Sequence, residues 1–410
     1  MALAVQACGS ATAHGHSAVR GNATSGSRAA GSKISARFFG LHAPLLATAF
    51  PKAKAGAVDL TLNGVYWPDL ETSSGVFDFS HLDTLVDQAH AHHAQPLLVL
   101  GQTPVFHSTS PGSPQVGATV PDLAAWKTYV GQLVDRYGTR IDYEIWPEAD
   151  IASNWSGTPR QLAELVIAAA KVIHHAAPRA TVVSPAMVLR LPYEQHFMKR
   201  LFAQKVGGKR IGHYVDAVGI DAYPLQAGTP EDSLSLIRQA QHILAKREVS
   251  APVWNVEMNY GVVGGNNPIP HHSGAAKQAS YVVRNFVLDA AAGIERVYWF
   301  DWGRLDVVDI EMVRPDGVTP TAAGRAYSLV EKWLAGQRVK ACQQSRKSHV
   351  YACTTSRGGH TSWIYWVPKG RRTVRAPKGA RHVQSVNGRV TRTHHHQKIK
   401  LTSSPVRVYH

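Results

Sequence analysis

Two glutamates each follow an apolar run that predicts a β-strand. Glu148 ends the segment Tyr-Glu-Ile-Trp-Pro-Glu at 143–148, and Glu257 lies in Val-Trp-Asn-Val-Glu-Met-Asn-Tyr-Gly at 253–261. Hydrolysis of a glycosidic bond requires such a pair, because one carboxylic acid protonates the leaving oxygen and one carboxylate attacks the anomeric carbon or activates water. A salt bridge at the rim of a fold would use the same residues, and spacing alone favours neither interpretation.

The strand that carries Glu257 has a polar pattern of its own. Because side chains alternate between the two faces of a strand, Asn255, Glu257 and Asn259 are predicted to share one face with Val253. Three polar side chains on one face of an otherwise apolar strand predict that this face points into a polar site. Asn259 is therefore a candidate substrate-binding residue.

The alternation of elements predicts how the two glutamates are brought together. From about residue 36 to 334, strand-like runs alternate with helix-like runs, and runs such as Leu97–Leu100 are wholly apolar, as in parallel sheets buried on both faces. Ser80 and Asp83 have the spacing of a helix capping box. Eight such strands predict an α/β fold, a (β/α)8 TIM barrel, whose sites lie at the carboxyl ends of the strands. A doubly wound sheet is the alternative, but no glycine-rich phosphate loop follows the first strand. The predicted strands are Arg37–Ala43, Val58–Tyr66, Pro96–Gly101, Ile141–Trp146, Ala180–Pro185, Val215–Tyr223, Pro252–Met258 and Arg296–Trp302.

The pattern of predicted elements changes after Trp333, and so does the charge. Short strand-like segments separated by turns predict a small all-β sandwich domain over residues 335–410, beside a catalytic domain over 36–334. This segment holds 16 of the 44 Lys and Arg residues and no Asp or Glu, so the rest of the chain has 28 basic and 28 acidic residues. A field of one sign favours an anionic partner such as a cell-envelope polymer. No motif in which aromatic residues alternate with basic ones is present, so nucleic acid is not expected as a partner.

The beginning of the chain resembles an export signal. Residues 1–35 open with a short apolar stretch, and Val5-Gln6-Ala7-Cys8 is similar to a bacterial lipobox, although no basic residues precede it. Gly9–Ser35 has no apolar period and predicts a flexible tether. We therefore expect a secreted or envelope-associated protein, with a lipid anchor at Cys8 as one route. No apolar run is long enough to predict a transmembrane segment.

Cysteines can form disulfides, and cysteines and histidines can bind metal ions. Cys342 and Cys353 lie in a predicted hairpin, where a disulfide would contribute roughly 3 kcal/mol, or where two reduced cysteines would be half-buried. The histidine clusters have no zinc-binding spacing, so no metal and no cofactor are expected. They are predicted to lie on the surface or in loops, at His90–His93, His174–His175, His271–His272 and His394–His396.

Several segments together resemble a known family. Trp146-Pro147-Glu148-Ala149-Asp150 is similar to the Trp-Asn-Glu-Pro-Asn motif of glycoside hydrolase clan A, and residues 256–261 resemble the strand that carries the nucleophile of that clan. Residues 64–83 and 100–104 are similar to the second- and third-strand segments of family 39 and its exported bacterial relatives. The resemblance covers about residues 37–410, including the β domain.

The resemblance implies roles for individual residues. Glu148 would be the acid/base and Glu257 the nucleophile of a retaining O-glycoside hydrolase acting on a carbohydrate, with Tyr223 orienting Glu257. Aromatic rings pack on the faces of sugars, which makes Trp299 and, after it, Trp302 candidates for stacking. Asp221 is a candidate for a hydrogen bond to a sugar hydroxyl.

Three departures from the family alter the expected subsite around the cleaved sugar. Pro147 replaces the asparagine that binds the sugar 2-hydroxyl, Asp221 replaces a histidine, and the segment Val58–Thr61 lacks the expected arginine. Ordinary β-xylosidase or iduronidase specificity is therefore not expected. A non-catalytic, carbohydrate-binding barrel at the cell surface and a polyanion-binding adhesion protein remain as alternative functions.

Overall fold

The computed structural model describes residues 32–44, 46–263 and 273–410. Cys8 and most of the predicted tether lie outside these residues, as do His271 and His272. Within the described part of the chain, no helix is long and apolar enough to cross a membrane.

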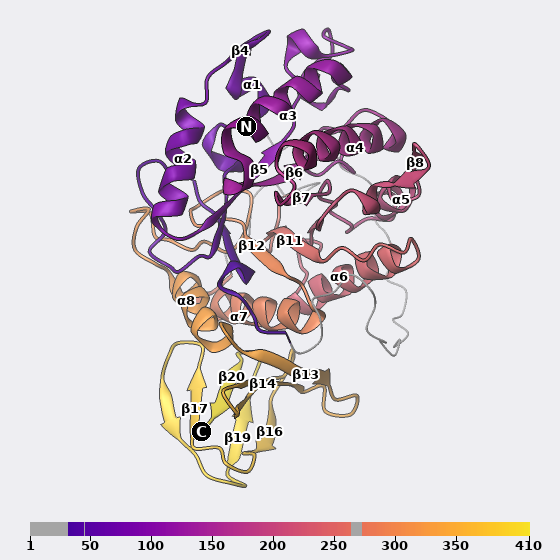
Figure 1. Cartoon of the computed structure of the whole chain (residues 1–410). Coiled ribbons are helices and arrows are strands. Elements are labelled where there is room, and N and C mark those ends of the chain that lie inside the picture. The colour runs from indigo at the N-terminus through magenta and orange to yellow at the C-terminus, as the bar shows by residue number, and fades with distance from the viewer. Residues whose placement is uncertain (1–31, 45, 264–272) are drawn as a thin grey trace.

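The first body of the molecule is a closed parallel barrel, which confirms the predicted fold (Figure 1). Eight strands are hydrogen-bonded in the order β10-β11-β12-β1-β2-β5-β6-β7, and a parallel bridge between Val183 and Ala217 joins the two ends. The strands are β1 (Phe39–His42), β2 (Ala57–Asp59), β5 (Gln95–Leu100), β6 (Asp142–Ile145), β7 (Val182–Val183), β10 (Val218–Asp221), β11 (Val253–Met258) and β12 (Arg296–Trp299).

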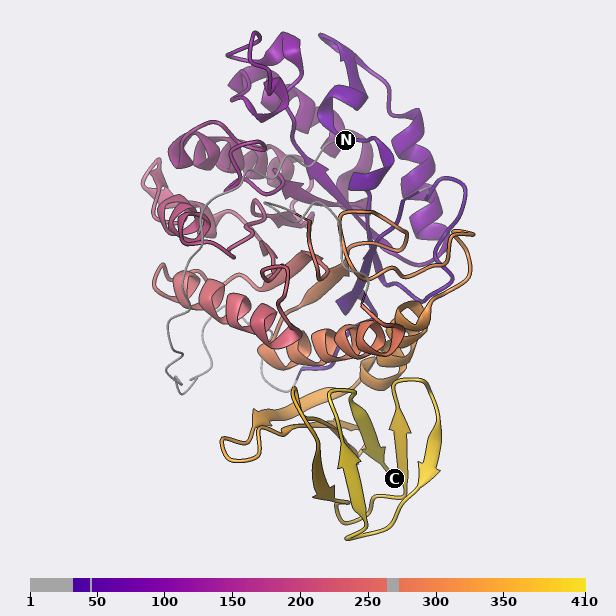
Figure 2. The same cartoon turned by 180° about the vertical axis from the view of Figure 1, so that it is seen from behind.

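Helices surround the barrel and cover the outer face of the sheet (Figures 1 and 2). They are α1 (Trp67–Leu70), α2 (Ser80–Ala91), α3 (Leu123–Tyr137), α4 (Pro159–Ala176), α5 (Pro192–Leu201), α6 (Pro230–Ala245), α7 (Ala275–Ala292) and α8 (Ala322–Leu334). Two short hairpins extend from the barrel, one formed by β3 (Glu71–Ser73) and β4 (Val76–Phe77), the other by β8 (Lys205–Val206) and β9 (Lys209–Arg210).

The strands are buried on both faces, as the apolar runs predicted. In β5, Leu97 packs inside the barrel with Tyr298, whereas Leu98 and Leu100 belong to the larger core between the sheet and the helices. Every residue of β5 is buried. Burial on both faces explains why this strand has no alternation of polar and apolar residues.

A capping box begins α4, whereas the capping box predicted for α2 does not form. In α4, Thr158 and Gln161 form a reciprocal capping box, with Thr158 Oγ1 accepting from the Gln161 N–H at 3.2 Å. The capping box predicted for Ser80 and Asp83 is wrong. The Asp83 carboxylate instead accepts from the Tyr137 hydroxyl at 2.9 Å and pairs with Arg136, so a contact between helices replaces the local one.

The second body is an antiparallel β domain, also as predicted. Six strands are ordered β13-β14-β15-β20-β17-β18, and β16 pairs with β19 in a second, two-stranded sheet. Both sheets contribute to one apolar core, which includes Ile399, Leu401 and Val408. Cys342 and Cys353 face each other across β13 and β14 and form a disulfide. The strands are β13 (Arg338–Gln344), β14 (Tyr351–Arg357), β15 (His360–Trp366), β16 (Arg372–Arg375), β17 (His382–Ser385), β18 (Val390–Arg392), β19 (Lys398–Leu401) and β20 (Val406–Tyr409).

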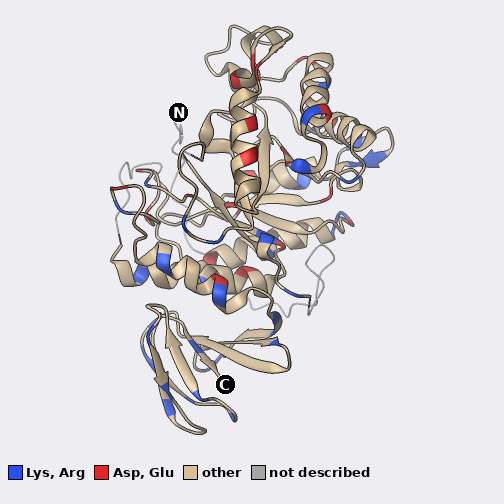
Figure 3. Ribbon diagram, turned by 60° about the vertical axis from the view of Figure 1, so that its left-hand side comes forward, with Lys and Arg blue, Asp and Glu red and all other residues tan. Residues whose placement is uncertain are grey.

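The β domain packs below α7 and α8 through specific polar contacts (Figure 1). Trp366 Nε1 donates to Glu231 Oε1 of α6 at 2.9 Å, and Trp333 Nε1 of α8 donates to Gln384 Oε1 of β17 at 2.8 Å. The Ile34 N–H donates to the Gln337 carbonyl at 2.8 Å, which ties the segment before β1 to the start of the β domain. Figure 3 shows basic but no acidic residues in the β domain.

Candidate active site

Glu257 lies near the carboxyl end of β11, but this strand does not keep the predicted alternation. Trp254 and Val256 pack inside the barrel. Asn255 points the other way, because its Nδ2 donates to Asp289 Oδ2 of α7 at 2.9 Å. The prediction that Asn255 and Glu257 share a face that lines the site is therefore wrong.

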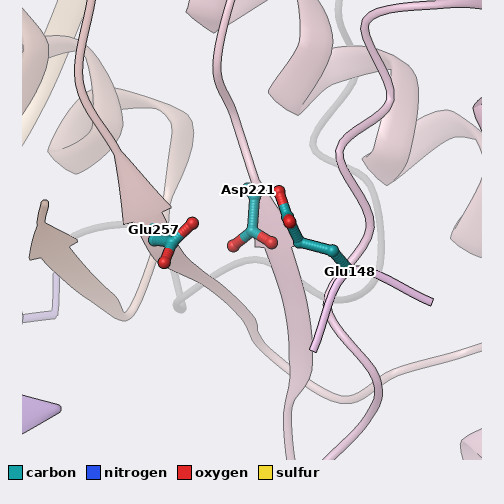
Figure 4. Close-up of side chains that lie close together, drawn as sticks. All are labelled: Glu148, Asp221 and Glu257. Atoms are coloured by element: carbon teal, nitrogen blue, oxygen red, sulfur yellow. The ribbon is translucent and has the colours of Figure 1, made fainter. Parts of the chain in front are cut away.

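A bulge in β11 explains the difference. Toward β10, Ile220 pairs with Asn255 and the next residue, Asp221, pairs with Glu257, so Val256 is skipped. The register toward β12 shifts over the same segment. An extra residue in one strand changes the direction of the side chain that follows it. The bulge turns Glu257 toward the barrel mouth, where Asp221 also points (Figure 4).

Asn259 holds the backbone together and does not present a polar atom to the mouth. Its Nδ2 donates to the carbonyls of Phe300 at 2.5 Å and Ile310 at 2.9 Å, and its Oδ1 accepts from the Tyr260 N–H at 2.6 Å. The side chain is fully buried. The substrate-binding role predicted for Asn259 therefore gives way to a structural one, fixing the loops that follow β11 and β12.

Glu148 is positioned by a tight turn after β6. Trp146 and Glu148 both have positive φ angles, of 77° and 37°, and such backbone requires support from its surroundings. The support comes from the buried Trp146 ring, which contacts Trp155 edge to face at 4.9 Å and donates through Nε1 to the Asn154 carbonyl at 2.7 Å. The same Asn154 donates from Nδ2 to Glu148 Oε2 at 3.0 Å. Asn154 therefore links the turn to the carboxyl group.

Three carboxyl groups converge at the barrel mouth (Figure 4). Oxygens of Glu148, Asp221 and Glu257 all lie within 4.8 Å of one another. Tyr223 donates its hydroxyl proton to Glu257 Oε2 at 3.1 Å, so the predicted partner of Glu257 is in contact with it. Glu148 and Glu257 are partly exposed, whereas Asp221 is buried. The two glutamates are accessible to a ligand, and Asp221 forms part of the wall between them.

Two polar residues that the sequence analysis missed lie beside this group. His42, the last residue of β1, has its Nδ1 3.2 Å from Asp59 Oδ1, and its Nε2 lies 2.8 Å from the Val256 carbonyl. Both side chains are almost fully buried. The available signal was their position, because each is a polar residue at the carboxyl end of a strand. The predicted strand Val58–Tyr66 continues past Asp59, so the sequence analysis did not place Asp59 at the end of a strand.

The electrostatics of the mouth follow from burial and crowding. Burial raises the pKa of Glu257 to about 8, although the charge of His42 and the hydrogen bond from Tyr223 act in the opposite direction. Burial also raises the pKa of Glu148, against the charge of Arg190 and the hydrogen bond from Asn154. Burial and the neighbouring glutamates raise the pKa of Asp221 far above its usual range. In all three carboxyl groups burial therefore favours the protonated form.

His42 is the cationic partner of this acidic group. Burial alone would lower the pKa of His42, but the charge of Asp59, the contact with its side chain and the charge of Glu257 together raise it to about 9. The imidazole therefore carries a positive charge at neutral pH. A charged imidazole stabilises the ionised form of Glu257 more than a neutral imidazole would.

The aromatic residues of the mouth differ from those predicted. Trp299 is fully buried between Tyr260 and Phe286 in the helix-facing core, so the stacking role predicted for it is wrong. Trp302 is also buried, packed edge to face against Tyr327. Tyr223 contacts Glu257 directly, and Phe300 packs beside it, with its ring centroid 6.4 Å from that of Tyr223 and 5.1 Å from that of His42.

The arrangement could in principle hold a cation. Among the described residues, Glu148, Asp221 and Glu257 form the group whose oxygens are spaced for a metal ion. The histidines do not join it: His90 Nε2 lies 2.8 Å from the Arg140 carbonyl, and His174 Nε2 lies 2.9 Å from Asp216 Oδ2. The chemical possibilities are therefore acid–base and nucleophilic work by the two accessible glutamates, or cation binding by all three groups.

No protein-family model and no curated protein sequence matches the chain. Solved structures do match. A family 39 glycoside hydrolase from the gut symbiont Bacteroides cellulosilyticus WH2 matches with a TM-score of 0.70 at 15% identity, over 92% of this chain and 81% of that one. A glucosidase from Croceicoccus marinus has a TM-score of 0.64 at 14% identity, over 92% of this chain and 97% of that one. The GH39 enzyme from Xanthomonas axonopodis pv. citri has a TM-score of 0.59 at 14% identity, over 93% and 95%. The chain thus shares its fold with glycoside hydrolases, as the resemblance predicted.

Proposed function

We propose that the protein is a retaining O-glycoside hydrolase. The observation that carries this proposal is the pair of accessible carboxyl groups, Glu148 after the fourth barrel strand and Glu257 on the seventh, with oxygens within 4.8 Å of each other. Retaining enzymes separate the two carboxyl groups by about 5–5.5 Å, whereas inverting enzymes need about 6.5–9.5 Å to admit a water molecule between them. The fold shared with glycoside hydrolases supports the proposal.

In the proposed reaction the two glutamates exchange roles in sequence. Glu148, whose protonated form burial favours, gives its proton to the glycosidic oxygen while the Glu257 carboxylate attacks the anomeric carbon. The leaving group departs, and a covalent glycosyl ester forms at Glu257. Glu148, now ionised, takes a proton from water, the water attacks the anomeric carbon, and the sugar leaves with its original configuration.

The surroundings of the two glutamates support this division of roles. Glu257 receives the hydrogen bond from Tyr223 at 3.1 Å and faces the charge of His42, both of which favour the carboxylate. Glu148 ends the turn at residues 146–148, and burial favours its protonated form against the hydrogen bond from Asn154 at 3.0 Å. The surroundings thus favour a carboxylate at Glu257 more than at Glu148 only through Tyr223 and His42, and burial favours the acid form that Glu148 needs.

The test is a screen of poly- and oligosaccharides with product detection, repeated for Glu257→Ala. We expect wild type to cleave at least one glycan and Glu257→Ala to lose at least about 10⁴-fold in rate, because the nucleophile itself is absent. An exposed carboxylate, Asp87→Ala, is the control and keeps full activity. Glycan binding without turnover by wild type would instead support the non-catalytic barrel.

We also propose that the β domain binds an anionic polymer of the cell envelope. A cavity of about 530 Å³ opens at the junction of α8 with the β domain, and its lining is rich in cations. Arg407 of β20 lines this cavity, and its Nη2 donates to Ser362 Oγ at 3.0 Å. The lining contains Lys332, Arg357 and Arg407, together with His360 and His410. Such polymers lie outside the cytoplasm, where the export signal expected in residues 1–10 would direct the protein.

A further inference from the structure

The barrel mouth holds more carboxyl groups than glycoside hydrolysis uses. Beside Glu148 and Glu257 lie Asp59, Glu144 and Asp221, each no more than 2% exposed. Among the described residues, nothing donates a hydrogen bond to Asp59 Oδ2, Glu144 Oε2 or Asp221 Oδ1, although all three atoms are buried. A buried acceptor without a partner is costly, so its retention calls for a function.

Asp221 is the surplus carboxyl group that stands nearest to the chemistry. Its Cα is paired with that of Glu257 across β10 and β11, and its side chain lies between the two catalytic glutamates (Figure 4). Asp59 has His42 as its cation at 3.2 Å, but no described Lys, Arg or His lies within ion-pair distance of Asp221. Burial and the charges of Glu257 and Glu148 raise its pKa far above the usual range. A cation placed here would relieve this repulsion.

The place of Asp221 indicates which part of a substrate it meets. The anomeric carbon lies between Glu148 and Glu257 during the proposed reaction, and Asp221 lies within 4.8 Å of both. The ring substituent next to the anomeric carbon is the one on C2. Pro147, the residue before Glu148, has no side-chain donor for a group at that position. Asp221 thus offers an unpaired acceptor near C2, and Pro147 supplies no donor to balance it.

Resting on the proposed glycoside hydrolase function, we propose that the substrate is a 2-amino-2-deoxy sugar with a free amino group, whose ammonium is bound by Asp221. An ammonium group has three donors and no acceptor, which matches the unpaired Asp221 Oδ1 beside the carboxyl oxygens of Glu148 and Glu257. It also brings a positive charge next to Asp221, which no described Lys, Arg or His approaches within ion-pair distance. A neutral hydroxyl or an N-acetyl group would satisfy one acceptor at most and leave the charge uncompensated.

A divalent metal ion is the competing occupant, and the chemistry disfavours it. An ion bound to all three carboxyl groups would engage Glu148 and Glu257 together. Glu148 could then not hold the proton for the leaving group, and Glu257 could not attack. On this account an added divalent cation inhibits the enzyme.

The experiment compares aryl glycosides that differ only at C2, in both anomers and in gluco and galacto configurations. The substituents are a free amine, an N-acetyl group and a hydroxyl. We expect wild type to prefer the amine over the matched hydroxyl compound in kcat/KM by at least about 30-fold, the range of a charge-assisted hydrogen bond. In Asp221→Asn, this ratio should fall to within about threefold of unity. Asp87→Asn, an exposed control on α2, should keep the wild-type ratio.

The outcomes separate this inference from the proposed function. Turnover of hydroxyl or N-acetyl glycosides without any preference for the amine overturns the amino-sugar inference and leaves the hydrolase intact. Binding of glucosamine or galactosamine measured by calorimetry, lost in Asp221→Asn but without turnover of any glycoside, supports the amino-sugar site and refutes the hydrolase. Activity that requires added Ca²⁺ and is abolished by a chelator overturns the inference in favour of the metal.

Discussion

The barrel mouth and the β domain carry opposite charge, and they differ even more in burial. At the mouth, carboxyl groups such as Asp221 and Glu144 are buried, and each has an oxygen to which no described residue donates a hydrogen bond. In the β domain the basic side chains are mostly exposed, as for Arg371, Arg372 and Arg389. Buried charges interact strongly with one chosen partner, whereas exposed charges are screened over about 8 Å at physiological ionic strength. The two proposed functions use this difference: selection of a single sugar unit at the mouth needs strong contacts with one partner, and binding of a polymer by the β domain needs many weak ones.

The largest effect is expected at the mouth, from a substitution of Glu148. Glu148→Ala should lower kcat/KM by about 10²–10⁴-fold on glycosides with poor leaving groups, because the proton donor is lost. Substrates with good leaving groups need little protonation and should be affected much less. Azide should restore part of the rate by attacking the glycosyl ester in place of activated water. An equal loss on both classes of substrate, with no rescue, would show that Glu148 is not the acid.

The charge of His42 should appear in the pH profile of the barrel. Because this cation lowers the pKa of Glu257, which burial raises to about 8, His42→Asn should raise that pKa further. The acidic limb of the kcat/KM profile, where Glu257 ionises, should then move to higher pH by about one unit, and activity at pH 7 should fall by about tenfold. The matched control His90→Asn, on the surface of α2, should not move the limb. An unchanged limb in His42→Asn would remove the electrostatic role of this residue.

Exposed cations of the β domain should respond to salt, unlike the mouth. Arg357→Gln and Arg371→Gln, both at exposed side chains, should each weaken binding to an anionic polymer, such as teichoic acid, by about 2- to 5-fold, and added salt should erase the difference. Activity on small neutral substrates should remain at the wild-type level. Lys127→Gln on α3 is the control. Binding of the full chain that does not change across a salt series would contradict this role of the β domain.

The smallest effects distinguish the aromatic residues of the core from those of the mouth. Trp299→Phe should lower the free energy of unfolding by about 1–3 kcal/mol and leave KM unchanged, because Trp299 contacts Tyr260 and Phe286 in the core. Phe300→Ala should raise KM by about 2- to 10-fold, since its ring lies near the mouth. Thermal unfolding and steady-state kinetics measure both. A rise in KM in Trp299→Phe alone would return the stacking role to that residue.

The sequence predicted the architecture well because burial leaves a strong pattern. Apolar runs such as Leu97–Leu100 mark strands covered on both faces, and the loss of acidic residues after Trp333 marks the β domain. Short motifs indicated Glu148, Glu257 and Tyr223 as candidates, and the structure brings these three residues together at the mouth. Their mutual contact is a property of the barrel, which places the ends of distant strands together.

The remaining errors have local physical causes. The bulge at Val256 breaks the two-residue period, so Asn255 faces α7 although simple alternation placed it beside Glu257. Trp299 was assigned to the mouth from its type, but it faces the helices. His42 and Asp59 act as a pair only because β1 and β2 are neighbours in the sheet. Bulges and pairs between strands depend on the three-dimensional register, which the order of residues alone does not display.

The central claim is that Glu257 forms the covalent bond to the sugar. The most direct measurement is mass spectrometry of peptides after reaction with a panel of 5-fluoroglycosyl fluorides, whose covalent intermediates hydrolyse slowly and keep the group at C2. The account predicts one glycosyl adduct, on the peptide that contains Glu257, and none in Glu257→Gln. An adduct on Glu148, or the release of product with inverted configuration and no adduct at all, would contradict it.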